Sequence, residues 1–343
     1  MKPLPLLIAL LFAATAAGQT KNRERGRFSV QGAAPVLMAV DGTGKFVLGA
    51  FDSGQALVWP IDQKNVYLHG FAAGKKAVTG GAFLPDGKTF LLSGADGTVK
   101  FFDTLEARKH HQECEKTSGD PKPPDPKPVK SITAHSGLSV VAVSLAADGK
   151  TLLTAGSDHS VKVWDVGDAK LLHTVKDAHG VGGVRALQFA PDGKRFATAG
   201  ADKTAKIWEL GAGLPVLLFK LDGHEGAVSS VSFSPDGKKV ATGSGVPKKS
   251  GSVRVWDAET GKVDYTLDGP QDAVTAVLFS KAGDHVAVGG LDLKILVFAL
   301  DDKKVKYTDD HAEAPKGFMN TPDGTLFGLW SKTSLRWFTG LGK

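Results

Sequence analysis

The stretch HGVGGVRALQFAPDGKRFATAGADKTAKIWE, residues His179–Glu209, decides the fold. Apolar and polar residues alternate in VRALQF (184–189) and again in the two segments that follow, which is the period of a half-buried strand. The turn PDGK (191–194) and the turn around Asp202 are too short to hold a helix. The stretch therefore predicts an antiparallel meander, and a meander of this size needs neighbours to bury both of its faces.

The same unit recurs along the chain. An aromatic residue closes the third strand of each unit, at Trp59, Phe102, Trp164, Trp208, Trp256, Phe298 and Phe338. Apart from two insertions the spacing is about 40–45 residues, which is typical of propeller blades with four strands each. We therefore predict an all-β fold, a seven-bladed β-propeller of four-stranded antiparallel blades, over residues 27–343.

The two ends of the chain are expected to form one blade together. The chain stops shortly after Phe338, so the last unit has no outer strand of its own. Near the N-terminus, the alternating segment Arg27–Gln31 belongs to no unit. We expect this N-terminal strand to complete the last blade, because closure of the ring removes exposed sheet edges.

These units resemble the WD-repeat (WD40-type) β-propeller family, most clearly in TAGSD (154–158), VKVWD (161–165) and VSFSPDGK (231–238). The resemblance covers nearly all of the chain after residue 18 and is weakest in the first and last units. It implies structural tetrads of a loop His, a second-strand Ser or Thr, a turn Asp and a third-strand Trp. Two units keep all four residues, namely His135, Thr154, Asp158, Trp164 and His179, Thr198, Asp202, Trp208. The unit with His224, Thr242 and Trp256 has Ser250 where the Asp is expected.

The N-terminal residues predict export. Residues 1–18 combine Lys2, an apolar core and small residues suited to cleavage, which is typical of a signal peptide, with an uncleaved anchor as the alternative. We expect a periplasmic or extracellular protein without a further membrane segment. The formal net charge is +6, but the lysines are spread through turns, which does not indicate nucleic-acid binding. Cys114 is the only cysteine, so an intramolecular disulfide is excluded.

Catalysis and cofactors are not expected. The seven segments predicted to line the central channel contain no Asp, Glu, His or Cys, so they offer no metal ligands and no acid–base pair. The Ser/Thr–His–Asp sets resemble a hydrolase triad, but they repeat from unit to unit, whereas a nucleophilic site is normally single. We therefore predict no catalytic residue, no metal and no cofactor, although sites built from loops stay open.

Residues 104–130 form an insertion in the second unit. A charged part is followed by the proline-rich PKPPDPKP (121–128), which we expect to be extended and solvated. His110, His111 and Cys114 are candidate ligands for a soft metal ion. Because all three lie in one five-residue segment of an expected flexible loop, we predict a solvated loop instead of a metal site.

The turns between second and third strands share one face with the His-bearing loops, and this face has a positive tendency. Its candidate protein-binding residues are His159, Arg185, Lys203, Lys248 and Lys249, with a solvated rim as the alternative. The expected function is that of an exported, non-enzymatic scaffold, monomeric as a fold, that binds one or more proteins. The alternatives are an exported hydrolase-like or lactonase-like propeller enzyme with a loop-built site, favoured by acidic loop clusters, and a protein that binds an envelope polymer, favoured by exposed aromatic residues.

Overall fold

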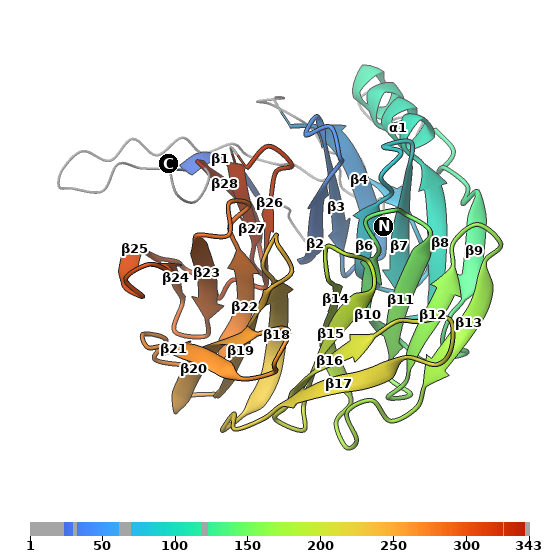
Figure 1. Ribbon diagram of the computed structural model, residues 1–343. Helices are drawn as coiled ribbons and strands as arrows, with labels where there is room; N and C mark the ends of the chain where they lie inside the picture. Colours follow the sequence, from blue (N-terminus) through green and yellow to red (C-terminus); the bar gives the residue numbers. More distant parts are fainter. Residues whose placement is uncertain (1–23, 30–32, 62–69, 118–122, 325, 340–343) are drawn as a thin grey trace, which may run out of the picture.

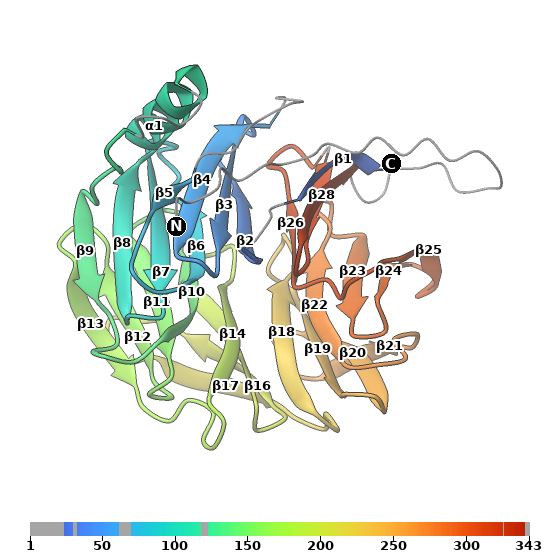
Figure 2. The same cartoon turned by 180° about the vertical axis from the view of Figure 1, so that it is seen from behind.

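The computed structural model describes residues 24–29, 33–61, 70–117, 123–324 and 326–339. In this part of the chain the strands form seven four-stranded antiparallel sheets, arranged in a ring (Figure 1). Figure 2 shows the same ring from behind, with the two ends of the described chain meeting in one sheet. The predicted signal peptide, residues 1–18, lies outside the described residues.

Each sheet places one strand at the centre of the ring, one at the rim and two between them. The central strands are β2 (Pro35–Val40), β6 (Val78–Phe83), β10 (Val140–Leu145), β14 (Val184–Phe189), β18 (Ala227–Phe233), β22 (Val274–Phe279) and β26 (Gly317–Asn320). The second strands are β3 (Phe46–Phe51), β7 (Thr89–Gly94), β11 (Thr151–Gly156), β15 (Arg195–Gly200), β19 (Lys239–Val246), β23 (His285–Gly290) and β27 (Leu326–Trp330). Each central strand lies beside the central strands of both neighbouring sheets, so the ring is continuous.

The outer half of each sheet follows the same order. The third strands are β4 (Gln55–Pro60), β8 (Thr98–Asp103), β12 (Val161–Asp165), β16 (Ala205–Glu209), β20 (Ser250–Asp257), β24 (Lys294–Ala299) and β28 (Ser334–Thr339). The rim strands are β5 (Phe71–Ala72), β9 (Lys130–Thr133), β13 (Lys170–Val175), β17 (Val216–Leu221), β21 (Val263–Leu267), β25 (Val305–Asp310) and β1 (Glu24–Ser29).

The expected blade count needs a correction. We use "blade" for a sheet built from four strands that follow one another in sequence, and in the described part of the chain six sheets meet this definition. The remaining sheet is a composite of β26, β27 and β28 with the N-terminal β1. The prediction of a seven-bladed propeller is therefore corrected to six blades and one composite sheet, in which β1 takes the place of a fourth strand that follows β28.

The composite sheet joins the two ends of the chain. Strand β1 pairs antiparallel with β28, with Arg27 opposite Arg336 and Ser29 opposite Ser334. The pairing segment begins at Glu24, three residues earlier than expected, and the expected residues Val30 and Gln31 lie outside the described part. This pairing covers the edge of β28 that would otherwise be open.

The hydrophobic core lies between neighbouring sheets. Trp208 of β16 packs with Leu153 and Val163 of the preceding sheet. In the same way, Trp256 of β20 packs with Ile207 of the sheet that precedes its own. The side chains on alternate positions of each strand therefore face one neighbour or the other, which explains why the sequence alternates so regularly. A meander that buries both faces in this way depends on the whole ring for its stability.

The expectation of a solvated loop after β8 is wrong, and so is a strictly all-β fold. Residues Thr104–Lys116 form α1, which lies beside β4 and β8 at the outer edge of the ring (Figure 1). Asp103 caps its first turn by accepting a hydrogen bond from the Glu106 amide at 2.9 Å. Ala107 is buried among the phenylalanines of the second blade, so this helix is packed on the propeller instead of being solvated.

Candidate functional site

The first tetrad ties a loop to a hairpin in the sheet of β10–β13. The His135 Nδ1–H group donates to the Asp158 carboxylate at 2.9 Å, and the Thr154 hydroxyl lies 3.0 Å from His135 Nε2. The Trp164 indole N–H donates to the same Thr154 oxygen at 3.0 Å. Because a carboxylate only accepts, this set assigns the Nδ1–H tautomer to His135 and leaves Nε2 to accept the threonine proton.

The second tetrad repeats this arrangement in the sheet of β14–β17. His179 Nδ1 lies 2.9 Å from Asp202, and its Nε2 lies 2.7 Å from the Thr198 hydroxyl. The Trp208 indole donates to Thr198 at 2.9 Å. The structure thus brings together all four residues of each predicted set.

The third set departs from the sequence-based expectation. His224 Nε2 contacts the Thr242 hydroxyl at 3.0 Å and Trp256 donates to that oxygen at 2.8 Å, but Ser250 does not take the Asp position. Instead the Ser244 hydroxyl contacts His224 Nδ1 at 2.7 Å. The reason is the longer hairpin, in which β19 and β20 continue to the pair Val246 and Ser250 and carry Ser250 away from the histidine.

The substitution follows from the space beside the histidine. In the first two tetrads the position two residues after the threonine is Gly156 or Gly200, where an added Cβ would meet the histidine ring at 2.2 or 2.1 Å. Ser244 occupies the corresponding position and uses its side chain as the hydrogen-bond partner. The pattern Thr-x-Ser in place of Thr-x-Gly is the sequence signal that could have identified Ser244.

A lysine that was not predicted from the sequence supports each tetrad. The Lys162 ammonium group donates to the Ala134 carbonyl at 2.7 Å, and Lys206 donates to the Ala178 carbonyl at 2.5 Å. Each acceptor is the residue directly before the tetrad histidine, so the lysine holds the loop from outside while the histidine holds it from within. The sequence signal that could have identified these lysines is the basic residue two positions before Trp164 and Trp208.

Burial keeps these histidines neutral. Desolvation lowers the pKa of His135 and of His179, although the hydrogen bonds that these rings donate to their aspartates oppose it. The pKa of His224 falls to about 4 because of burial and, to a smaller degree, the Arg254 charge. Burial alone would raise the pKa of Asp158, but hydrogen bonds from His135 and Ser160 outweigh it, and the net pKa is lowered.

The burial of the tetrads fits a structural role and not a catalytic one. Thr154, Thr198 and Thr242 are fully buried, and each hydroxyl is already engaged by a histidine and a tryptophan. A nucleophile must reach its substrate, and a hydroxyl buried between two rings cannot do so without opening the fold. Among the described residues, no group of three His, Cys, Asp or Glu side chains could hold a metal ion.

The candidate metal ligands on α1 do not converge. His110 Nδ1 faces Cys114 Sγ at 3.9 Å, whereas the opposite nitrogen, Nε2, faces Asp125 at 3.4 Å. A single ion cannot bind both nitrogens of one ring, so Cys114 and Asp125 cannot share a metal with it. His110, His111 and Cys114 are all buried, in contrast to the solvated segment expected from the sequence.

The expected docking residues come from corresponding places in neighbouring sheets. His159, Lys203 and Lys248 lie in turns between second and third strands and have a positive φ of 63°, 66° and 61°. The His159 ring lies against the Gly183 backbone of the next sheet, and the Lys248 amide donates to Asp272 of the following loop at 2.6 Å. The turns and the His-bearing loops therefore share one face, which we call the tetrad face.

Arg185 reaches this face through a bulge. The pairing of β14 with β15 shifts register between Val184 and Ala186, so Arg185 lies at the bulged position and its side chain is exposed. A bulge redirects the side chain that it contains. Lys203, Lys248 and Lys249 are also exposed, whereas His159 is half-buried.

Exposed apolar side chains, which were not predicted from the sequence, lie in the loops and turns of the tetrad face together with these cations. Val181, in the loop after His179, is 93% exposed, and Leu138, in the corresponding loop after His135, is 46% exposed. Leu291 and Leu293 are exposed around the turn between β23 and β24. They could have been identified in the sequence as apolar residues within short or glycine-containing loops, which do not contribute to the hydrophobic core.

Comparison with known proteins agrees with this geometry. The family model described as WD domain, G-beta repeat matches residues 65–103, 126–165, 169–209, 215–257 and 261–298, which is more than half of the chain. No curated protein matches the chain. The one helix in the described residues is not long and apolar enough to cross a membrane. With its ring of sheets, its repeated tetrads and these five matches, the chain belongs to the WD40 repeat family.

Proposed function

We propose that this protein is a non-enzymatic scaffold that binds another protein through the tetrad face. The observation that carries the proposal is the combination of exposed Val181 with two exposed cations, Arg185 near the start of β14 and Lys203 in the turn between β15 and β16. Apolar side chains and arginine are enriched at the centres of protein interfaces. WD40 propellers usually bind proteins, which supports the same reading.

The charge on this face is available to a partner. In the described part of the chain, no carboxylate oxygen lies within 4.0 Å of the side-chain nitrogens of Arg185, Lys203 or Lys249. The tetrad aspartates are turned inward to the histidines, which leaves the cations facing outward. We therefore infer that the partner presents acidic side chains around an apolar residue.

Rigid loops favour binding over catalysis at this face. The loops that carry His135 and His179 are each held by their histidine and by a lysine from the third strand of the same sheet, so these loops are positioned before a partner arrives. Such preorganisation lowers the entropy cost of association. An enzyme with a loop-built site and a protein that binds an envelope polymer are the rival functions, and the experiment below tests the second of these against the proposal.

The test compares charge reversals on the two faces. The variant Arg185→Glu/Lys203→Glu changes the tetrad face, and Lys150→Glu/Lys194→Glu makes the same change in the exposed turns of the opposite face. A partner captured by the native protein should bind the purified native and control proteins equally and the first variant at least tenfold more weakly. Equal binding by both variants, or no protein partner together with binding to an envelope polymer, would contradict the proposal.

Export is part of the proposal and has its own test. The apolar segment of residues 4–14 followed by small residues supports a cleaved signal peptide. The mature protein should begin after Gly18 and occur outside the cytosol. The intact mass and N-terminal sequence of the protein from its native source would show this, and an uncleaved N-terminus would contradict it.

A further inference from the structure

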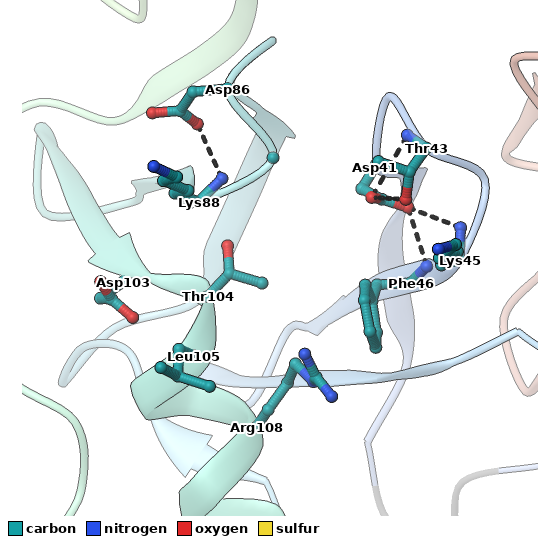
Figure 3. Close-up of a pocket in the computed structure, with 11 residues that line it drawn as sticks. Asp41, Thr43, Lys45, Phe46, Asp86, Lys88, Asp103, Thr104, Leu105 and Arg108 are labelled. Carbon is teal, nitrogen blue, oxygen red and sulfur yellow. Dashed lines mark hydrogen bonds between the residues drawn. The ribbon is translucent and has the colours of Figure 1, made fainter.

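A pocket opens on the opposite face, where the turns between first and second strands lie. It has a volume of about 470 Å³ and is enclosed by the turn after β2, the turn after β6 and the first turn of α1 (Figure 3). The blades that end in β13, β17, β21 and β25 have a short turn or loop where α1 begins, so the helix distinguishes this place from those four blades. Cavities of this size accept small ligands.

Three cations line the pocket. Lys45 and Lys88 come from the two turns, and Arg108 comes from α1. The Arg108 guanidinium lies 3.9 Å from the centre of the Phe46 ring, which fixes its position. Within the described residues, none of the three has a carboxylate partner within 4.0 Å.

The carboxylates at the pocket are already occupied by other donors. Asp41 accepts from the amides of Lys45 and Phe46, each at 2.8 Å, and Asp86 accepts from the Lys88 amide at 2.9 Å. Asp103 caps α1. The acidic residues thus shape the turns, while the three cations keep their hydrogen-bond donors for a ligand.

A buried hydroxyl gives a second, independent indication of a ligand. Thr104, the first residue of α1, is only 4% exposed, and its hydroxyl has no hydrogen-bond partner among the described residues. In Figure 3 this oxygen points into the space between the two turns. A buried polar group without a partner is costly, and a bound ligand would remove that cost.

We propose that this pocket binds a phosphate-type dianion, either free phosphate or the phosphate group of a small phosphomonoester. Arg108, Lys88 and Lys45 supply the positive charge, and the Thr104 hydroxyl donates to one phosphate oxygen. A dianion with several acceptor oxygens matches three cations and a hydroxyl better than a carboxylate does. The volume exceeds that of a phosphate group, which leaves room for an attached organic group beside Phe46.

The test titrates the purified full chain with inorganic phosphate, phenyl phosphate and acetate, followed by calorimetry or by amide chemical shifts. Saturable 1:1 binding of phosphate or phenyl phosphate in the millimolar range or tighter is expected, with acetate much weaker. Tighter binding of phenyl phosphate would identify a phosphomonoester, and tighter binding of inorganic phosphate would identify the free ion. No saturation with either phosphate, or equal binding of acetate, would overturn the proposal.

Matched variants locate the site. Lys88→Ala and Arg108→Gln should each weaken phosphate binding at least tenfold, whereas Lys194→Ala, in the identical PDGK turn of another blade, should leave it unchanged. Thr104→Val should weaken binding about tenfold, and Thr104→Ser should restore it. An equal loss in the Lys194→Ala variant would show that phosphate binds nonspecifically to surface lysines and would overturn the proposal.

Discussion

Three buried histidines show what single residues contribute to this propeller. His135 and His179 each use an aspartate and a threonine, whereas His224 uses two hydroxyl groups, from Thr242 and Ser244. The histidines, threonines and tryptophans could be placed from sequence because their spacing repeats. Ser244 could not, because its role depends on the length of one hairpin, and that length is set by pairing beyond the repeat.

The neutral His224 makes stability depend on pH. Its folded pKa of about 4 lies below the value of 6.5 for an exposed histidine, so between these values the unfolded chain binds a proton that the folded chain does not. The contribution of the neutral His224 to the free energy of unfolding should therefore be fully present above pH 6.5. It should fall by about 3 kcal/mol as the pH drops to 4. Denaturant unfolding at pH 7.5 and 4.5, with an NMR titration of the His224 ring, measures this. A His224 ring that titrates near 6.5 would contradict it.

Removing one hydroxyl should show how much a tetrad contributes to the free energy of unfolding. Thr198→Val leaves the Trp208 indole and the His179 ring without their shared partner in a buried site. We expect a loss of about 2–4 kcal/mol in the free energy of unfolding. The control is Thr308→Val on the exposed rim strand β25, which should change stability by less than about 0.5 kcal/mol. Similar losses in both variants would argue against the role assigned to Thr198.

At the level of elements, α1 is where sequence-based prediction failed. The charged composition of residues 104–116 suggested a loop, but Ala107, His110, His111 and Cys114 recur at helical spacing and form the buried face. Asp103 followed three residues later by Glu106 is a helix N-cap signal. The helix was missed because histidines and a cysteine supply its apolar face in place of leucines. The anion pocket was missed for the same reason, since it exists only where α1 begins.

The cap of α1 can be tested directly. Asp103→Ala removes the acceptor of the Glu106 amide and should lower the free energy of unfolding by about 1 kcal/mol. Asp103→Asn keeps a capping oxygen and should stay within a few tenths of a kcal/mol. Denaturant titration of the two variants measures the difference. If both lose the same amount, charge and not capping is the cause.

At the level of the whole molecule, the repeat predicted most of the architecture. The period, the turns and the alternation placed the strands because each repeat buries its two faces against its neighbours. The N-terminal strand was expected to complete the last sheet, and β1 does pair with β28. The count of seven blades was wrong because that sheet is a composite of two distant segments and not four consecutive strands. The first strand also begins earlier than its alternation suggested, since pairing with β28 sets its limits.

Closure by β1 gives a prediction at this scale. A chain that starts after Ser29 lacks the partner of β28 and exposes that edge. It should unfold at a temperature lower by more than about 5 °C and aggregate more readily than a chain that starts at Glu24. Thermal unfolding monitored by circular dichroism and light scattering compares the two. Equal melting temperatures would show that β1 is not needed for closure.

The most direct test of the proposed function is the footprint of a purified partner on the amide hydrogen exchange of this protein. We predict slower exchange in residues 180–185 and 201–204, which carry Val181, Arg185 and Lys203, and unchanged exchange in the PDGK turn at 191–194. Protection of that turn with none in the loops would place the partner on the opposite face and contradict the assignment of the tetrad face as the docking surface.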